Sequence, residues 1–434
     1  MASITGFSPL RYDPARVSVA NVVTQPYDKI NSEMQEKYYA SSPYNLVRII
    51  LGKRNPEDGE GNNVYTRAAA SFADWRRQGI LKPDPQPSIY VYVQRFTAPG
   101  SKAELERRGF IALGRIEDYS AGVVFRHEQT LAKPKADRLD LLRATRAHFG
   151  QIFMLYSDPA QEVDGLLAPG GPPEVEVADE YGVSHRLWKV SDPAVIASVS
   201  GKMADKKLII ADGHHRYETA LNYRNERRAQ AGTAARAGEA PYDRVMMTLV
   251  NMDAPGLLIL PTHRVVHGLS SFSSSALRDR AREFFRVEEI DPAFDAAGAM
   301  ARLSKAGEKG TALLAVSANR AFLMDHPKGS SSVFAGFSPR QQTLDVVQLH
   351  KCLLEGVLGL SEESIREQQN LSYIRDADEA LNRVRRGAAN VAFLMNPAKM
   401  EQVRDIAFAG EVLPQKSTDF YPKLLSGLAI YPLG

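Results

Sequence analysis

The sequence has a single cysteine among its 434 residues, Cys352. One thiol cannot form an intramolecular disulfide, so a disulfide-stabilised fold is excluded and a reducing, cytoplasmic location is expected. Long hydrophobic stretches are also missing, since the longest apolar runs, such as LVRIIL and GLLILP, are too short to cross a bilayer. The N-terminal MASITGFSPLRYDP has no basic segment followed by an apolar core, so no signal peptide is expected.

The sequence has little excess charge of either sign. Lys and Arg together number 54 and Asp and Glu number 51, which gives a formal net charge of +3 at pH 7. A dedicated nucleic-acid binder usually has a basic face that shows in the total charge, so nucleic acid is not an expected partner. The 24% of charged residues is typical of a globular protein, and the length predicts two or three domains.

Common nucleotide and metal motifs are missing as well. The sequence contains no G-x-x-x-x-G-K-[ST], and no G-x-G-x-x-G follows a predicted strand, so neither a P-loop nor a Rossmann-type dinucleotide site is supported. H-E-x-x-H is also missing, because His127-Glu128 is followed by Gln-Thr-Leu. His263 and His267 are four residues apart in THRVVH, but the two valines between them favour a strand over a metal-binding helix. No metal site is predicted.

Apolar segments rich in β-branched and aromatic residues alternate with helical patterns, which predicts an α/β (α+β) fold. Strands are expected at 88–96, 110–116, 152–157, 208–211, 245–252 and 257–260, and the clearest helices at 62–79, 136–149 and 214–232. The Pro-, Gly- and acid-rich segment 159–180 is expected to be a loop or an internal subdomain seam. Because a Gly/Ser-rich tract at 268–275 precedes a new helical pattern, domains are predicted for residues 1–267 and 268–434. The second domain should contain a long helix over 345–358.

The stretch KKLIIADGHHRYETAL, residues 206–221, joins a predicted strand to a predicted helix. Backbone N–H groups in the first turn of a helix have no intrahelical acceptor, and the helix dipole places partial positive charge there. Asp212 fits an ordinary N-cap, but a cap does not explain the Gly-His-His-Arg that follows. The stretch therefore predicts an anion site, with phosphate as the expected anion, at Gly213, His214, His215 and Arg216.

Four other polar clusters lie at the ends of apolar segments: QPYDKI (25–30), FRHEQTLAKPKADR (125–138), LPTHR (260–264) and LPQKSTDFYPK (413–423). Taken singly, a His-Glu pair is commonly a satisfied hydrogen bond, and lysines are commonly solvated. Taken together with residues 213–216, these clusters supply the donors and carboxylates needed to hold a polyphosphate and activate a hydroxyl. Their candidate residues are Asp28, His127, Glu128, Lys416, Ser417, Thr418 and Lys423.

The blocks resemble those of a known family. PYDKI, RHEQTLAKPKADRLDLL, IADGHHRYETAL, LPTHRVV and LPQKSTDFYPKLLSGL are similar, in that order and over nearly the whole chain, to a bacterial and archaeal family called domain of unknown function 1015. A more distant resemblance concerns the strand, Gly-His-His-Arg and helix, which are similar to the phosphate-binding signature of the ParB/sulfiredoxin superfamily. Its members include free serine kinases, chromosome-partitioning CTPases and sulfiredoxin. This resemblance implies a ParB/sulfiredoxin-like nucleotide-binding domain followed by an additional C-terminal α/β domain.

The three branches of this superfamily make different demands on the sequence. Sulfiredoxin needs a cysteine where this chain has His214, and the partitioning proteins carry a helix-turn-helix region that is not recognisable here. The kinase branch needs a nucleotide, Mg²⁺, a hydroxyl substrate and a carboxylate base. The resemblance therefore implies a phosphotransferase that uses ATP or ADP with Mg²⁺ to phosphorylate a small hydroxylated metabolite, with free serine as one candidate. A nucleotide sensor without turnover and a nucleotide hydrolase remain alternatives.

In the kinase hypothesis the candidate residues divide into two roles. Residues 213–216 hold the phosphates, and Lys416 or Lys423 balances their charge. Asp212, Ser417 and Thr418 complete the predicted nucleotide-binding residues. The general base is Asp28 or Glu128, with His127 beside it. A solvated C-terminal tail would leave its aromatic residues exposed, so the C-terminal block is expected to return to the phosphate site. This predicts Lys416 or Lys423 within about 10 Å of the helix that begins after Gly213.

Overall fold

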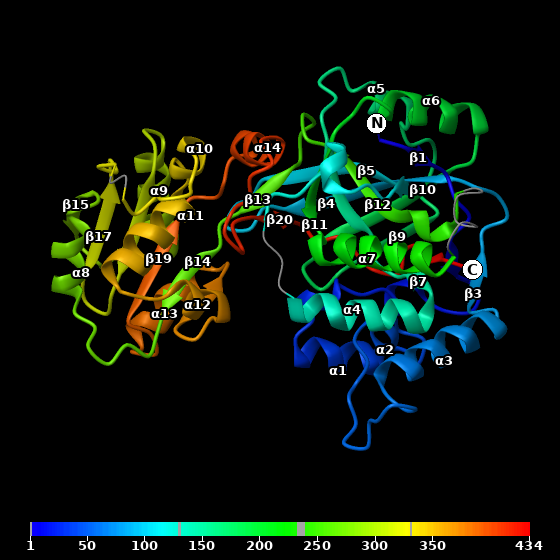
Figure 1. The fold of residues 1–434 in the computed structure, drawn as a ribbon, viewed down its shortest axis with the longest axis horizontal. Helices are drawn as coiled ribbons and strands as arrows, with labels where there is room; N and C mark the ends of the chain where they lie inside the picture. Colours follow the sequence, from blue (N-terminus) through cyan, green and yellow to red (C-terminus); the bar gives the residue numbers. More distant parts are fainter. Residues whose placement is uncertain (1, 129–131, 232–238, 330–331) are drawn as a thin grey trace. The chain divides into compact units, whose positions relative to one another are not determined.

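The computed structural model describes residues 2–128, 132–231, 239–329 and 332–434, and it divides into two compact units (Figure 1). Unit 1 comprises the described residues of 1–126, 130–258 and 422–434, and unit 2 comprises those of 127–129 and 259–421. This division differs from the expected boundary at 267/268 in three respects. Residues 259–267, which include the LPTHR segment, belong to unit 2, as do the described residues of 127–129. Residues 422–434 belong to unit 1.

Unit 1 is built on a mixed sheet. Across the sheet the strands are β6 (Val124–Phe125), β11 (Leu208–Asp212), β8 (Ile152–Tyr156), β12 (Arg244–Asn251), β5 (Glu104–Arg115), β4 (Ile89–Thr97), β10 (Ser184–Val190) and β9 (Val175–Ala178), and β1 (Ile4–Thr5) also pairs with β5. β11 runs parallel to β6, and β8 runs parallel to β12, whereas the other neighbours are antiparallel.

Helices and two short strand pairs complete unit 1. The helices are α1 (Ser32–Ser41), α2 (Val47–Ile50), α3 (Val64–Arg77), α4 (Ala132–Thr145), α5 (Glu162–Leu166), α6 (Pro193–Met203) and α7 (His214–Ala231), with 3-10 turns η1 (Val19–Asn21), η2 (Tyr27–Lys29), η3 (Tyr119–Ala121) and η5 (Pro241–Asp243). α4 and α7 lie side by side (Figure 1). β2 (Leu10–Tyr12) pairs with β3 (Leu81–Pro83), and β21 (Tyr431–Pro432) pairs with β7 (Ala147–His148). The second pair ties the C-terminal segment into unit 1.

The core of unit 1 follows from the two-residue period of its strands. Ile89, Val91 and Val93 of β4 share one hydrophobic cluster with residues of β5 and α7. Side chains at alternate positions of a strand point to opposite faces, so Tyr92 and Gln94 lie on the other face of β4. The polar side chain of Gln94 is nevertheless buried, which means that this second face holds a buried polar group.

Unit 2 contains an antiparallel sheet. Its strands, in order, are β15 (Arg286–Ile290), β17 (Ala321–Asp325), β16 (Ala312–Val316), β19 (Val391–Met395), β14 (His263–Val266) and β18 (Leu371–Ile374), and β13 (Leu258–Leu260) pairs separately with β20 (Asp419–Tyr421). The helices are α8 (Ser274–Ala281), α9 (Ala296–Gly307), α10 (Pro339–Gln342), α11 (Asp345–Gln348), the π-helix η6 (Leu349–Val357), α12 (Glu362–Glu367), α13 (Ala377–Arg385) and α14 (Met400–Phe408).

Both faces of the unit 2 sheet are buried, which explains its continuous apolar runs. In β16, Leu313 and Ala315 enter one hydrophobic cluster, and Leu314 and Val316 enter the other. The single cysteine, Cys352, is buried on the first of these faces, and burial raises the pKa of its thiol to about 12. Such a thiol is protonated and packs as a small apolar side chain.

The α/β class expected from the sequence is confirmed, and strands lie in all six of the segments predicted for the first domain. Two expectations need correction. Segment 159–180 is more than a loop, because it contains α5 and β9. The helix expected over 345–358 is α-helical only as far as Gln348 and continues as the π-helix η6. None of the described helices is long and apolar enough to cross a membrane.

Gly109 in the middle of β5 supplies a test of the unit 1 sheet. A Cβ atom on Gly109 would lie 2.6 Å from the backbone oxygen of Leu249 in the neighbouring β12. Gly109→Ala should therefore lower the free energy of unfolding by about 1–3 kcal/mol, as overpacking does in cores. Urea unfolding followed by tryptophan fluorescence measures this effect, because both tryptophans, Trp75 and Trp188, belong to unit 1.

Gly201→Ala in α6 is the matched control. No atom lies within 4 Å of the position that its Cβ would take, and alanine favours a helix over glycine by about 0.5–1 kcal/mol. The control should be at least as stable as the parent protein. Equal unfolding midpoints for the two variants would contradict the close β5–β12 packing.

Candidate phosphate site at the start of helix α7

The junction between β11 and α7 brings backbone N–H groups to one point. β11 ends at Asp212, Gly213 adopts a left-handed conformation with φ of 92°, and α7 begins at His214. Glycine is favoured here, because side chains of L residues rarely adopt such a φ, and a Cβ atom would also lie 2.8 Å from Nε of Arg216. The N–H of Tyr217 donates to the carbonyl of Gly213 at 2.9 Å, so residues 214–216 form the first turn of α7.

Asp212 holds two cationic side chains beside this helix start. Its Oδ2 accepts a hydrogen bond from Nη2 of Arg216 at 2.7 Å, and its Oδ1 accepts one from Nζ of Lys423 at 3.1 Å. All three side chains are largely buried, with exposed fractions of 22% for Asp212, 15% for Arg216 and 9% for Lys423. The carboxylate thus joins the first turn of α7 to the C-terminal segment of the chain.

The charges around Asp212 keep it ionised. Burial by itself raises the pKa of this carboxyl, but attraction to Lys423, Arg216 and Lys29 outweighs burial and holds the pKa below its usual range. Because the pKa in the folded state is lower than in the unfolded chain, the stabilisation is complete above the unfolded value of about 4 and is lost as the pH falls through the folded pKa. The ion pairs are therefore intact at neutral pH.

A small cavity lies beside Arg216. Its volume is about 70 Å³, and its polar lining includes Tyr27, Arg138, His148, Arg216, Thr219 and Ser426. The Arg138 guanidinium lies 4.1 Å from the centre of the Tyr27 ring, and burial raises the pKa of Tyr27 to about 12. The hydroxyl oxygen of Thr219 is buried and has no hydrogen-bond partner among the described residues. The cavity is thus partly polar where it meets the helix start.

The candidate base Asp28 lies in the 3-10 turn η2, between Tyr27 and Lys29. Its side chain is exposed, whereas Gln25 three residues earlier is buried. The chain entering η2 is tied to the C-terminal segment, because Thr24 and Ser426 exchange backbone hydrogen bonds of 3.1 and 2.8 Å. The segments that carry Asp28 and Lys423 are therefore held together within unit 1.

A second group of candidates meets in unit 2. The Lys416 N–H donates to Oε1 of Glu128 at 2.8 Å, and Nε2 of His127 lies 2.7 Å from Oγ1 of Thr418. The hydroxyl of Ser417 donates to the Pro414 carbonyl at 2.5 Å. His127 and Glu128 are thus hydrogen-bonded to the LPQKST block. Both residues have hydrogen-bond partners, as the alternative to an acid-base role requires. Residues 129–131 of the RHEQTL block lie outside the described part of the chain.

Arg264 of the LPTHR block is the fully buried cation of this second group. Its Nε donates to Nε2 of His350 at 3.2 Å, and its other donors reach the carbonyls of Thr262, Gln415 and Lys416 at 2.5, 3.3 and 3.1 Å. The guanidinium also lies 4.4 Å from the centre of the Tyr373 ring. Burial lowers the pKa of Arg264 to about 10, so it stays charged at neutral pH.

Comparison with known sequences identifies the family. The sequence model described as "Protein of unknown function (DUF1015)" matches residues 4–347. The chain belongs to this family. No curated protein matches the chain in sequence.

Several solved structures are distantly similar to this member of the DUF1015 family. A free serine kinase variant in complex with AMP shares 13% identity, covering 70% of this chain and 89% of that chain, with a TM-score of 0.37. A conserved hypothetical protein from Pyrococcus furiosus shares 12% identity over 68% and 86% of the two chains, with a TM-score of 0.34. SbnI from Staphylococcus aureus, truncated at its C-terminus, shares 9% identity over 73% and 85%, with a TM-score of 0.30.

The structure distributes the sequence candidates between the two units. Unit 1 contains Asp28, residues 212–216 and Lys423, and unit 2 contains His127, Glu128 and residues 416–418. The prediction that Lys416 or Lys423 lies within about 10 Å of the start of α7 is confirmed for Lys423, which bonds Asp212. The LPQKSTDFYPK block is divided, because its first nine residues belong to unit 2 and its last two to unit 1.

Sequence reasoning did not single out Lys29, Tyr27 or Arg138 as site residues. Lys29 and Tyr27 flank Asp28 within PYDKI, and Arg138 ends the quoted 125–138 block, so their blocks were recognised but their roles were not. The signal was available for Lys29, since a lysine next to a candidate base in a short turn can face the same ligand. Nothing local distinguishes Arg138 from the other basic residues of α4.

Asp212→Asn tests the charge balance of the site. The variant leaves Arg216 and Lys423 without their shared counter-charge, so we expect it to lower the free energy of unfolding by about 2 kcal/mol, less than for a fully buried pair. Inorganic phosphate should then raise the Tm of the variant more than that of the parent, because it replaces the missing charge. Scanning calorimetry with and without phosphate measures both effects.

Asp118→Asn is the matched control. Asp118 forms a similar ion pair, at 2.8 Å, with Arg224 of α7, but the Asp118 side chain is 58% exposed. Phosphate should shift the Tm of this control no more than that of the parent. An Asp212→Asn protein that is as stable as the parent and insensitive to phosphate would contradict an anion site at this position.

Proposed function

We propose that the chain is a nucleotide-dependent phosphotransferase that transfers a phosphoryl group from ATP or ADP to a small hydroxylated metabolite. The observation that carries this proposal is the meeting of Arg216 and Lys423 at Asp212, directly before the first turn of α7. These residues lie more than two hundred positions apart in the sequence, so the fold gathers cations at a helix start that already favours anions.

The phosphates of the nucleotide would bind at the N–H groups of residues 214–216, with Arg216 and Lys423 on either side. Arginine donates bidentate hydrogen bonds to phosphate, and lysine supplies a compact positive charge. Asp212 keeps both cations aimed at the helix start before the nucleotide arrives. Arg216, Lys423 and Lys29 act on Asp212, and these three positive charges outnumber the two carboxylates Asp212 and Asp28, so the site retains a net attraction for a polyphosphate.

The described residues of the site offer Mg²⁺ a carboxylate but no complete set of protein ligands. Among the described residues no group of three or more His, Cys, Asp or Glu is arranged to hold a metal ion. Mg²⁺ in nucleotide sites commonly uses one or two carboxylates together with phosphate oxygens and water, and Asp212 would supply such a carboxylate. When bound, the ion would neutralise charge on the phosphates.

The acceptor hydroxyl needs a carboxylate to take its proton, and Asp28 or Glu128 is the proposed base. Asp28 is exposed on η2, beside Lys29, whose charge acts on Asp212. Glu128 uses one oxygen to hold the N–H of Lys416 in unit 2. Free serine is the acceptor that the ParB/sulfiredoxin resemblance suggests, and the exposed setting of Asp28 suits a small soluble acceptor.

Arg216→Ala tests the phosphate site. We expect the variant to bind ADP and ATP at least about a hundredfold more weakly, because it loses a charge-assisted hydrogen bond to phosphate in a largely buried site. Isothermal calorimetry measures the affinity, and circular dichroism shows that the fold is intact. Arg228→Ala, on the same helix and paired with Asp243, is the control and should bind like the parent. Unchanged affinity in Arg216→Ala would remove this residue from the site.

Asp28→Asn and Glu128→Gln separate the two candidate bases. The variant that lacks the base should lose turnover by about a hundredfold or more while its nucleotide affinity is unchanged. The other variant should change stability or binding instead. The assay follows radiolabel from the terminal phosphate of ATP or ADP into a metabolite pool. Label transfer supports a kinase, whereas nucleotide binding without any product favours a sensor, and phosphate release without an acceptor favours a hydrolase.

A further inference from the structure

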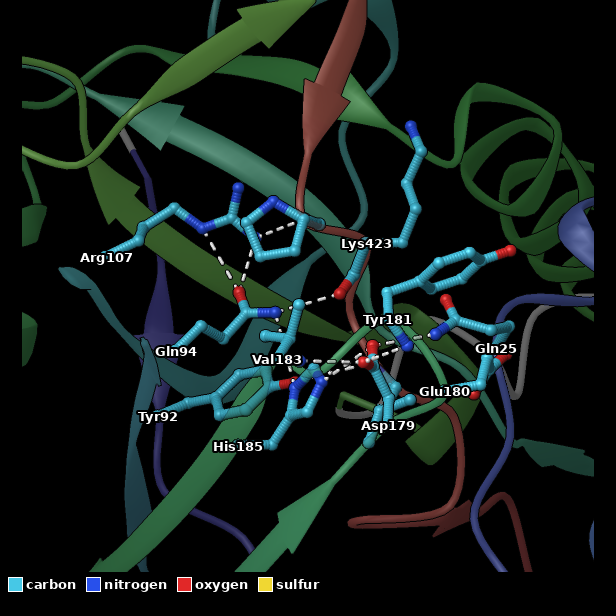
Figure 2. Close-up of polar contacts among 12 residues, drawn as sticks. Gln25, Tyr92, Gln94, Arg107, Asp179, Glu180, Tyr181, Val183, His185 and Lys423 are labelled. Carbon is cyan, nitrogen blue, oxygen red and sulfur yellow. Dashed lines mark hydrogen bonds and ion pairs between the residues drawn. The ribbon is translucent and has the colours of Figure 1, made fainter. Parts of the chain in front are cut away.

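A buried chain of polar side chains is hydrogen-bonded to the main chain at Lys423 (Figure 2). Nε2 of Gln94 donates to the backbone carbonyl of Lys423 at 2.8 Å, and Oε1 of Gln94 accepts from Nε of Arg107 at 3.1 Å. Arg107 also donates to the carbonyl of Pro422 at 2.5 Å. Gln94 on β4 and Arg107 on β5 are therefore hydrogen-bonded to the peptide groups on both sides of the Lys423 Cα atom.

The same chain continues to the segment before Asp28. The backbone N–H of Leu425 donates to the hydroxyl of Tyr92 at 3.3 Å, and this hydroxyl lies 2.7 Å from Nδ1 of His185. Nε2 of His185 lies 3.2 Å from Oδ2 of Asp179, which also accepts from Nε2 of Gln25 at 2.9 Å. With Tyr92 donating to Nδ1, the proton of His185 is on Nε2 and points to Asp179.

The burial of this chain is unusual for polar groups. Gln94, Arg107 and His185 are 2%, 1% and 0% exposed, and burial lowers the pKa values of both His185 and Arg107, the latter to about 10. His185 is therefore neutral near pH 7, and Arg107 remains charged. Replacing a buried charge such as Arg107 by apolar side chains of similar volume is often neutral or stabilising, because desolvating a charge is costly. Stability alone does not account for a polar chain here.

We propose that Gln94, supported by Arg107 and His185, is a positioning residue that fixes Lys423 at Asp212 and couples this arrangement to the Gln25–Asp28 segment. The role in phosphate binding rests on the proposed function, whereas the positioning of Lys423 does not. The backbone bridge between Thr24 and Ser426 also links the two segments directly, through hydrogen bonds of 3.1 and 2.8 Å. Gln94 touches neither Asp212 nor Arg216 through any contact described for it, and acts through the main chain of Lys423.

The test compares three substitutions in the full-length protein. Gln94→Leu removes the hydrogen bonds of Gln94 with the Lys423 carbonyl, with Arg107 and with Nδ1 of His185, which lies 3.3 Å from Nε2 of Gln94. Gln94→Glu keeps an acceptor for Arg107 but has no donor for the Lys423 carbonyl. Gln151→Leu is the control, because Gln151 belongs to the same unit, is equally buried at 1% exposure and has no hydrogen bond from its amide group among the described residues.

Three measurements are made on each variant. Acetic anhydride labelling with peptide mass spectrometry gives the acylation rate of the Lys423 amine, calorimetry gives the ADP affinity, and thermal unfolding gives the stability. Gln94→Leu and Gln94→Glu should both raise the acylation rate and weaken ADP binding by about tenfold, the scale expected of a side chain displaced by a fraction of an ångström to one ångström. Gln94→Glu should be the more stable of the two, since Arg107 keeps a partner.

The outcomes separate this proposal from a structural role and from the proposed function. If Gln94 had only a structural role, the acylation rate of Lys423 would change only in proportion to the loss of stability. Gln94→Glu would then have the same acylation rate and the same thermal stability as Gln151→Leu. That result would overturn the proposal, as would an unchanged acylation rate in Gln94→Leu. If the parent protein does not bind ADP, the proposed function fails, but a faster acylation of Lys423 in both Gln94 variants still supports the positioning role.

Discussion

One carboxylate sets the geometry of the candidate site. Asp212 lies at the end of β11 and holds Arg216 with one oxygen and Lys423 with the other. The first bond requires Gly213 to take a left-handed conformation, so that the Arg216 guanidinium can fold back over the turn. The second requires residues 422–434 to return to unit 1, where β21 pairs with β7. The strand end, the turn and the C-terminal path are thus parts of one arrangement.

The local part of this arrangement could be predicted from the sequence, because its causes are local. An apolar run ending in Asp-Gly and followed by a helical pattern predicts a strand, a turn and a helix start, and the physics of helix termini then predicts an anion. Lys423 was predicted from a cluster that no local structure explained. Its partner is Asp212, some two hundred residues earlier, and the sequence supplied the candidate but not the pairing.

The remainder could not be predicted because it depends on pairing between distant strands. The two-residue period of β4 shows that Gln94 lies opposite the apolar face, but it does not show that Arg107 and the Lys423 carbonyl come within reach. The division of LPQKSTDFYPK between the units was missed for the same reason, since the residues of that block look alike in the sequence. The π-helix at Leu349–Val357 was also missed, because its apolar pattern equally fits an α-helix.

Arg264 in unit 2 and Arg216 in unit 1 use their donors differently, and this difference bears on the proposed phosphate site. Arg264 in unit 2 is fully buried and donates to His350 and to three backbone carbonyls, so its donors are already used by the protein. Arg216 in unit 1 is 15% exposed, and its hydrogen bond among the described residues is to Asp212. A phosphate could share the guanidinium of Arg216 without breaking backbone hydrogen bonds, whereas at Arg264 it would leave carbonyls unsatisfied. The cost of an unsatisfied buried group therefore favours Arg216 over Arg264 for the proposed phosphate site. Arg264 instead links the LPTHR and LPQKST blocks of unit 2 through its hydrogen bonds to their carbonyls.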